Sequence, residues 1–304
     1  MQEITCPNPC TRAPRVCTTS QTELASLYLY PTALQNLVTA VVWRDTHGLN
    51  LSPAQRLSHF PTTPLVSLSW FHDCDLGLVT SSAQGTAWQP FEGRIQLSGS
   101  QSRPFTSWSS RAGRSGMVCF TADQAHKLFN IDLTIINDRF VPAHTLLDKR
   151  WWPLLDDLAK AAEGEAILAV LRQHLINQPS NSDRHNLPSI RELGRHWVQR
   201  LNIQAQAWQR LYSTRQVQRL IKDYTGRSLR EWEMMVKTEQ VFFAAQAQYN
   251  QGLSIDWATM AQDSGFADQA HLNRWTKRIS GFAPGDFAQR FVADESFWLY
   301  RLWI

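Results

Sequence analysis

Hydrophobic positions near the end of the chain recur at helical intervals, and one pattern occurs twice, 55 positions apart. Within residues 213–226 and again within 268–281, mostly apolar side chains follow the i, i+3, i+4, i+7 spacing of one buried helix face. The two stripes are Val217, Leu220, Ile221 and Tyr224 in the first copy and Leu272, Trp275, Thr276 and Ile279 in the second. Each copy therefore predicts one short amphipathic helix.

The other face of each predicted helix is polar and basic. Arg219 and Lys222 of the first copy match Arg274 and Lys277 of the second. A glycine closes each copy at the position where a left-handed helix end is favoured. These glycines are Gly226 and Gly281. The repeat predicts two basic helices that both face outward.

A longer helix is expected between the two copies. Residues 229–248 favour one helix of about 20 residues, which is about 30 Å long at about 1.5 Å per residue. Successive major-groove faces on one side of B-form DNA are about 34 Å apart. A rigid helix of this length would let both basic helices reach the major groove from the same side of a duplex.

The residues that flank the copies also favour helices joined by turns. Ser189 is expected to cap a first helix that includes Trp197, and a second short helix is expected over 205–211. Before the second copy, Gly265 predicts the tight turn of a helix-turn-helix, with Phe266 filling its corner. Asp268 is expected to cap the helix that follows. Residues 189–304 thus predict an all-α domain.

The first half of the chain has a different pattern. Residues 25–120 combine short apolar runs with prolines and isolated glycines, which favours short strands and turns in a sandwich or open barrel. Residues 151–162 and 165–176 then favour two helices that cover the barrel or meet a second subunit. We expect an α+β multidomain chain with a disordered tail over 1–20, a β-rich domain with flanking helices over 21–176, and a polar linker over 177–188.

Composition and charge narrow the class of protein. The chain has 304 residues, 43% hydrophobic and 18% charged, which is ordinary for globular domains. Up to residue 188, 15 Lys and Arg balance 15 Asp and Glu; from residue 189 the counts are 15 and 11. The excess of +4 therefore lies in the helical part and favours a polyanionic partner there. No apolar run could span a membrane and the first residues do not resemble a secretory signal, so we expect a cytoplasmic protein.

Cysteine and histidine spacing gives little support for catalysis or metal binding. Cys6, Cys10 and Cys17 cluster, but the cluster lacks both a tight CxxC pair and a fourth ligand. The histidines of the first half are scattered and do not form the close set of a metal-dependent cupin enzyme. We expect no catalytic residues, no metal and no cofactor.

Residues 189–291 resemble the AraC/XylS family of bacterial transcription regulators. The resemblance rests on residues 265–277 and 281–287 for the second helix-turn-helix and on 213–226 for the first. By this resemblance the side chains that contact bases are Arg215, Gln218, Arg219, Gln269, His271, Asn273 and Arg274. Those that contact phosphate are Lys222, Lys277 and Arg278. The family also implies an N-terminal jelly-roll-like sensor and dimerisation domain, and RNA polymerase as a partner.

Elementary chemistry supports these roles. Arginine can pair with the O6 and N7 of guanine and glutamine with adenine, each contact giving about 1 to 3 kcal/mol of discrimination, whereas lysine mainly neutralises phosphate. Two alternatives stay open. Arg219 and Arg274 could instead form internal ion pairs between the two units, and His271 could be an ordinary surface histidine.

Some positions depart from the family pattern. Thr276 stands where a large aromatic residue is usual and Ser264 where an apolar one is usual, while residues 237–239 lack the Arg-Leu-Glu run common in the linker helix. The second unit is therefore expected to be looser, with aromatic side chains such as Trp275 refilling its core. Trp43, Trp70, Trp88 and Trp108 could line an effector pocket or be plain core.

Together these patterns predict a sequence-specific transcriptional regulator, an activator by resemblance, that binds promoter DNA and associates with the nucleoid when bound. A small-molecule or protein effector and a homodimer remain open as partners. Two other classes also remain. A DNA-repair methyl acceptor would need a zinc-bound reactive cysteine, and an architectural DNA binder would show little sequence preference and steep salt dependence.

Overall fold

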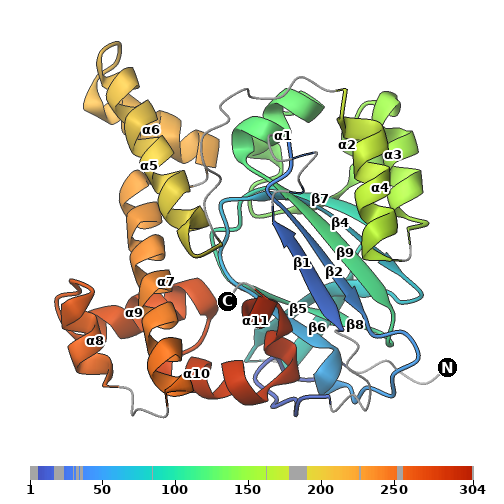
Figure 1. Ribbon diagram of the computed structural model, residues 1–304, viewed down its shortest axis with the longest axis horizontal. Coiled ribbons are helices and arrows are strands. Elements are labelled where there is room, and N and C mark those ends of the chain that lie inside the picture. The colour runs from blue at the N-terminus through green and yellow to red at the C-terminus, as the bar shows by residue number, and fades with distance from the viewer. Residues whose placement is uncertain are drawn as a thin grey trace.

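The structure is a computed structural model that describes residues 6–16, 24–29, 31, 34, 37–83, 85–161, 163–177, 190–225, 227–251 and 256–302. Strands dominate up to residue 142, and the elements after it are helices (Figure 1). This arrangement confirms the expected α+β organisation, with a β-rich region before a helical one. The expected linker at 177–188 lies, apart from residue 177, outside the described residues.

The described strands form two antiparallel sheets. The strands are β1 (Ala25–Leu29), β2 (Ala40–Asp45), β3 (Leu57–Phe60), β4 (Val66–His72), β5 (Leu76–Ser82), β6 (Gly85–Pro90), β7 (Ile95–Ser98), β8 (Phe105–Ser109), β9 (Arg114–Phe120) and β10 (Phe140–Pro142). One sheet has the order β1-β2-β9-β4-β7-β10 and the other β3-β8-β5-β6. Strand β2 pairs with β9, β3 with β8, β4 with β7 and β5 with β6, so that each pair lies within the previous one along the chain.

Helices cover one face of the six-stranded sheet. The helical segments of this region are η1 (Ala54–Arg56), α1 (Ala122–Phe129), η2 (Leu133–Ile135), α2 (Ala143–Leu146), η3 (Lys149–Trp151), α3 (Trp152–Leu158) and α4 (Gly164–Leu175). Buried side chains of α1, α3 and α4 form one cluster with alternate strand residues such as Val41, Leu68 and Val118. The helices expected over 151–162 and 165–176 are therefore present as α3 and α4, and they pack on the sheet.

The isolated glycines were expected to lie in turns between short strands, but Gly116 does not. It lies inside β9, opposite Trp70 of β4. A Cβ atom added at Gly116 would be 2.3 Å from the Trp70 ring. The residue is glycine because the indole occupies the space of a side chain.

The helical part starts with α5 (Ile190–Gln209), followed by α6 (Thr214–Thr225), α7 (Leu229–Asn250), α8 (Trp257–Asp263), α9 (Gln269–Ser280), α10 (Pro284–Ala293), η4 (Glu295–Phe297) and α11 (Trp298–Leu302). The separate helices expected before the first copy are one continuous helix, α5. No glycine or proline interrupts residues 198–204, and Val198, Leu201 and Ala205 continue the buried stripe. The prediction of two separate helices was wrong, because a stretch with few apolar residues does not end a helix when no helix-breaking residue is present.

The first described residues differ from the expected disordered tail. Within residues 6–16, Cys6 and Ala13 are buried, and Pro14 forms an isolated bridge with Asp294. The Ala13 carbonyl accepts a hydrogen bond from the Glu295 amide at 2.5 Å. This segment is held by residues about 280 positions away, which local composition does not reveal.

The end of the helical part packs back on the β-rich region. Strand β3 is an edge of the four-stranded sheet, and η4 and α11 lie along it. The large apolar cluster of the six-stranded sheet also includes Val198 and Leu201 of α5, Trp232 and Met235 of α7, and Ile279 of α9. The two regions thus share one core. No helix of the described residues is long and apolar enough to cross a membrane.

Candidate nucleic-acid interface

Helix α6 has the two faces that its sequence predicts. Ser213 and Gln216 form reciprocal hydrogen bonds at its start, which satisfy backbone N–H groups that have no partner within the helix. Val217 and Ile221 are buried against Ala205 of α5. The predicted DNA-contacting side chains of this helix are all exposed; they are Arg215, Gln218, Arg219 and Lys222. Gly226 and the side chain of Tyr224 lie outside the described residues.

Helix α9 also follows the expectation at both ends. The Asp268 carboxylate accepts a hydrogen bond from the His271 amide at 2.6 Å and so caps the helix. Gly265 has φ +68° in the turn after α8, and Gly281 has φ +86° at the end of α9. Phe266 is buried in that turn. The sequence-based predictions of the turn, the cap and the helix end are confirmed.

The outward face of α9 carries most of its predicted contacts. Gln269, Asn273, Arg274 and Lys277 are exposed, whereas Leu272, Thr276 and Ile279 face the interior. Thr276 is completely buried, and the neighbouring Trp275 packs against both of the adjoining apolar clusters. Trp275 therefore contributes the aromatic packing that Thr276 cannot, as expected.

Two of the predicted contact residues have partners within the chain. The Trp275 indole donates a hydrogen bond to Nε2 of His271 at 3.0 Å, and the His271 ring lies edge-on to Phe266. Arg278 forms an ion pair with Glu231 of α7, and its guanidinium lies over the Trp275 ring. Both side chains stabilise the second helical pair, α8 and α9, and would have to leave these partners to reach DNA.

The remaining cationic side chains have no acidic partner among the described residues. Among the described residues, no ion pair involves Arg215, Arg219, Lys222, Arg274 or Lys277. The alternative in which Arg219 or Arg274 holds the two units together by an internal ion pair thus has no partner there. Five cations and the amides between them are free to meet a polyanion.

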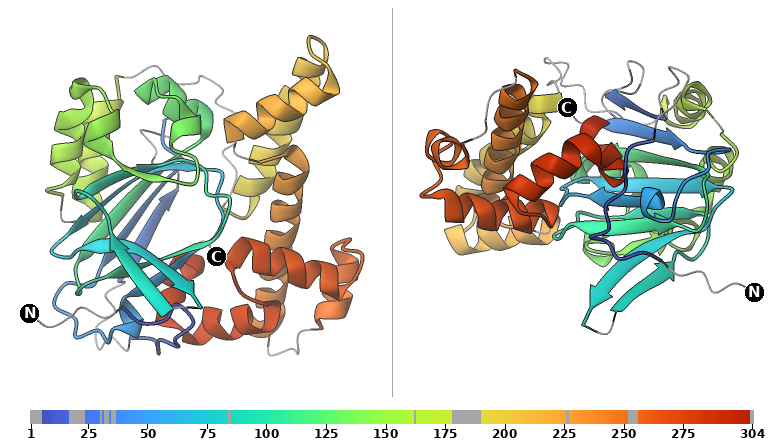
Figure 2. Two further views of the ribbon diagram at one scale, coloured as in Figure 1. Left: turned by 180° about the vertical axis from the view of Figure 1, so that it is seen from behind. Right: turned by 90° about the horizontal axis from the view of Figure 1, so that it is seen from below.

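Helix α7 contacts both outward-facing helices. Figure 2 shows α6 and α9 on the same side of α7 in its left view. Near the first, the Trp232 indole donates a hydrogen bond to Oγ1 of Thr225 at 2.8 Å. Near the second, Lys237 donates one to the Gly265 carbonyl. With 22 residues, α7 is about 33 Å long at about 1.5 Å per residue.

The four tryptophans proposed to line one pocket lie in two places. Trp43 and Trp70 belong to the core between the six-stranded sheet and its helices. Trp108 and Trp88 pack edge to face in a separate cluster with Leu57 and Cys6. The alternative of plain core is confirmed for Trp43, Trp70 and Trp108, which are buried in two separate clusters.

Three of the cysteines are poorly suited to nucleophilic chemistry. Burial raises the pKa of Cys6 and of Cys74 to about 11 and that of Cys119 to about 12. A thiol attacks as its thiolate, so these side chains are weak nucleophiles at neutral pH. Cys10 is exposed while Cys6 is buried in the cluster of Trp108, and Cys17 lies outside the described residues.

Comparisons with known proteins give weak likenesses only. No family model and no curated protein matches the chain. ToxT from Vibrio cholerae is similar at 12% identity and a TM-score of 0.35, over 87% of this chain and 98% of ToxT. Wild-type ToxT of strain SCE256 with a bound unsaturated fatty acid gives 12% and 0.32, over 78% and 94%. The AraC-like transcriptional activator CuxR gives 11% and 0.23, over 92% and 91%. These identities and scores are too low to establish a common fold or function.

Proposed function

We propose that this chain is a sequence-specific DNA-binding transcriptional regulator of the AraC/XylS type. The observation that carries the proposal is that α6 and α9, two capped helices with exposed arginine, lysine and amide side chains, both pack on one linker helix, α7. Successive major-groove faces on one side of B-form DNA are about 34 Å apart, and the proposal requires the two exposed faces to be separated by about that distance when DNA is bound. Two helix-turn-helix units would then read two adjacent groove segments.

Base contacts and phosphate contacts divide between the exposed side chains. Arg215, Gln218 and Arg219 would read one half of the site, while Gln269, Asn273 and Arg274 would read the other. Lys222 and Lys277, near the helix ends, would neutralise phosphate. His271 and Arg278 are proposed only as contacts made after they exchange their present partners for DNA.

The β-rich region is proposed as the sensor and dimerisation domain. The nested pairing of β2 with β9 through β5 with β6 supports a jelly-roll-like architecture. An effector that binds one arrangement of this region more tightly than another would alter the free energy of DNA binding by no more than the difference between its two binding free energies. The core shared with α5, α7 and α9 offers a physical route for that coupling. Promoter DNA, an effector, RNA polymerase and a second copy are the proposed partners, with activation in the cytoplasm as the expected role.

In vitro selection of bound duplexes from a random library tests the proposal. We expect one enriched bipartite motif whose halves are separated by about one helical turn. Arg219→Ala and Arg274→Ala should each weaken binding by about 1 to 3 kcal/mol and relax preference in one half only. Lys222→Ala is the matched control, because loss of a phosphate contact weakens binding equally on all sequences.

Other outcomes of the selection, together with a footprint and a methyl-transfer assay, would identify other functions. Tight binding with no enriched motif, and with a steep salt dependence, would replace the proposal with an architectural role. Protection of a single groove segment in a footprint would refute the two-helix geometry. Transfer of a methyl group from alkylated DNA to a cysteine would identify a repair protein, against which the raised pKa of the buried thiols argues.

A further inference from the structure

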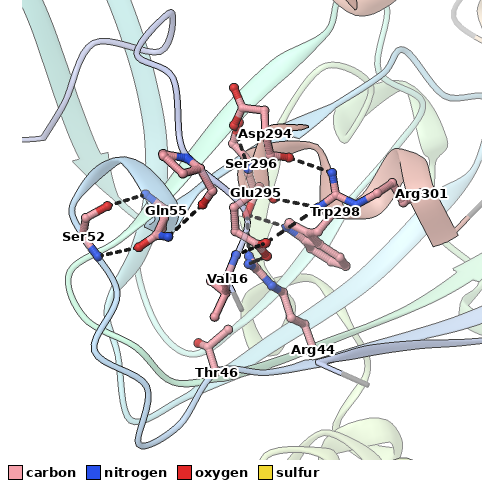
Figure 3. Close-up of polar contacts among 12 residues, drawn as sticks. Val16, Arg44, Thr46, Ser52, Gln55, Asp294, Glu295, Ser296, Trp298 and Arg301 are labelled. Atoms are coloured by element: carbon pink, nitrogen blue, oxygen red, sulfur yellow. Dashed lines mark hydrogen bonds and ion pairs between the residues drawn. The ribbon is translucent and has the colours of Figure 1, made fainter. Parts of the chain in front are cut away.

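The segment after α10 joins the second helical pair to the β-rich region through a buried ion pair (Figure 3). Arg44 of β2 and Glu295 of η4 are 2.8 Å apart, and only 7% and 6% of their side chains are exposed. Burial lowers the pKa of Arg44 to about 10 although the Glu295 carboxylate favours its charged form, so the guanidinium stays charged at neutral pH. The two residues are 251 positions apart in the sequence.

A tryptophan lies beside this ion pair. The Trp298 indole donates a hydrogen bond to Oγ of Ser58 on β3 at 2.9 Å, and the Arg44 guanidinium lies over the Trp298 ring at 4.7 Å. The Glu295 carboxylate also accepts a hydrogen bond from the Val16 amide at 3.2 Å. The charges are thus paired and closed off from water, with Arg301 3.8 Å from the same carboxylate and Nε of Arg44 without a hydrogen-bond partner. A buried ion pair of this kind can fix a specific geometry.

The end of the second outward-facing helix rests on the same region. The Thr62 amide, just after β3, donates a hydrogen bond to the Ile279 carbonyl of α9 at 3.0 Å. Arg290 of α10 is held by Asp294 at 2.9 Å and donates a hydrogen bond to the Cys10 carbonyl at 2.6 Å. The first contact holds the C-terminal end of α9 and the others hold α10, while Asn273 and Arg274 stay exposed.

The first outward-facing helix also contacts the β-rich region at its C-terminal end. Helix α6 lies against η2, and the Arg227 guanidinium after α6 is buried over the Trp232 ring. Burial lowers the pKa of Arg227, whereas the carboxylates of Glu231 and, less strongly, Asp138 favour its charged form. The outer face of α6, with Arg215 and Arg219, remains exposed. Both helices therefore contact the β-rich region, and the face of each that is proposed to bind DNA stays exposed.

We propose that the β-rich region is a brace that sets the relative position of the two reading helices, with Arg44 and Glu295 as the positioning residues that hold the second unit to it. The inference rests on the proposed function. A region that masked the DNA-binding surface would bury Arg219 or Arg274, and both are exposed. Fixing two contact surfaces at a set distance raises the effective concentration of the second once the first is bound. The brace would thus favour duplexes whose two half-sites have the matching spacing.

The test compares Arg44→Met and Glu295→Gln with the wild-type chain. Each variant is titrated with the selected bipartite duplex, with a duplex holding one half-site, and with a duplex whose half-sites are 5 base pairs further apart. Loosening the brace should weaken binding to the bipartite duplex by on the order of tenfold. Half-site affinity should stay within about twofold of the wild type, and the penalty for the altered spacing should shrink. Arg12→Met is the matched control, because the Arg12–Asp286 pair joins the same regions but is largely exposed.

Hydrogen exchange provides a readout that does not depend on DNA. In the Arg44→Met and Glu295→Gln variants, backbone amides should exchange faster than in the wild type at Thr62 and over residues 294–302. Exchange in β4 and β9 should be unchanged. Equal losses on the half-site and bipartite duplexes would overturn the positioning role, and tighter binding would mean that the contact restrains DNA binding. If the wild-type chain shows no sequence preference, the proposed function fails. Hydrogen exchange alone then tests whether Arg44 and Glu295 hold the second unit to the β-rich region, and unchanged exchange at Thr62 in both variants would overturn that role.

Discussion

Protonation of His59 should destabilise the protein as the pH falls below neutral. The ring is 2% exposed on β3, with Nδ1 2.9 Å from Oγ1 of Thr106 and the rings of Phe282 and Phe297 about 5 Å away. Burial lowers its pKa from 6.5 to about 3; the nearby Arg290 lowers it further, whereas Asp286 and the Pro9 backbone act in the opposite direction. Folded His59 is therefore neutral where unfolded His59 is charged.

The size of the effect follows from the two pKa values. Below pH 6.5 the unfolded chain binds a proton at His59 that the folded chain does not, so the free energy of unfolding decreases as the pH falls. Each pH unit in that range costs about 1.36 kcal/mol, which gives a loss of about 2 kcal/mol by pH 5. The pKa of His72 is also lowered by burial, so the wild-type slope includes a second histidine. The contribution of His59 is the difference between the wild-type chain and a variant without that imidazole.

Urea unfolding at pH 7.5 and at pH 5, followed by tryptophan fluorescence, measures this difference. His59→Gln and His59→Leu both remove the titrating group, one keeping a polar side chain and the other filling the apolar space. The stability of each variant should depend less on pH than that of the wild type, by about 2 kcal/mol over this interval. If the loss between the two pH values matched the wild type within about 0.5 kcal/mol in both variants, His59 would not be the cause.

Further predictions concern the strand core, the second outward-facing helix and the linker helix. Gly116→Val should lower stability by about 1 to 3 kcal/mol in a thermal melt because the added atoms meet the Trp70 ring; Gly285→Ala, which meets no atom within 4 Å, should not lower it. Asp268→Ala should cost about 1 kcal/mol and weaken protection of one half-site, while Asp268→Asn keeps the cap; equal melting of both variants would contradict the capping role. Trp232→Phe removes the hydrogen bond to Thr225 and should cost about 1 kcal/mol in urea unfolding, whereas Trp152→Phe at an exposed position should change little.

The two outward-facing helices were predictable because their signals are local. The periodicity of α6 and α9, the Asp268 cap and the glycines at 265 and 281 each depend on residues within one or two turns. The length of α7 follows from an unbroken run without glycine or proline. Exposure of the cationic face followed from the same periodicity, since buried positions fix the opposite side of a helix.

Contacts between distant segments could not be predicted in the same way. Nothing near Arg44 indicates that Glu295 lies beside it, and nothing in residues 6–16 indicates burial under α10 and η4. The family resemblance implies DNA contacts for His271 and Arg278, yet their partners are an indole on the same helix and a carboxylate on α7. The short apolar runs of residues 25–120 indicated strands but could not assign those strands to one sheet or the other.

The contact of Trp298 with Ser58 spans 240 residues and has a consequence for biosynthesis. At about 5 to 20 residues per second, the ribosome takes roughly 10 to 50 seconds to deliver Trp298 after Ser58 has been made. Throughout that interval the unpaired backbone groups of β3 have no cover from η4 or α11, and such an edge invites pairing with strands of other nascent chains. Synthesis on crowded polysomes, or at a temperature that speeds aggregation more than elongation, should therefore yield insoluble protein, and a chaperone that shields exposed strand edges should raise the soluble fraction.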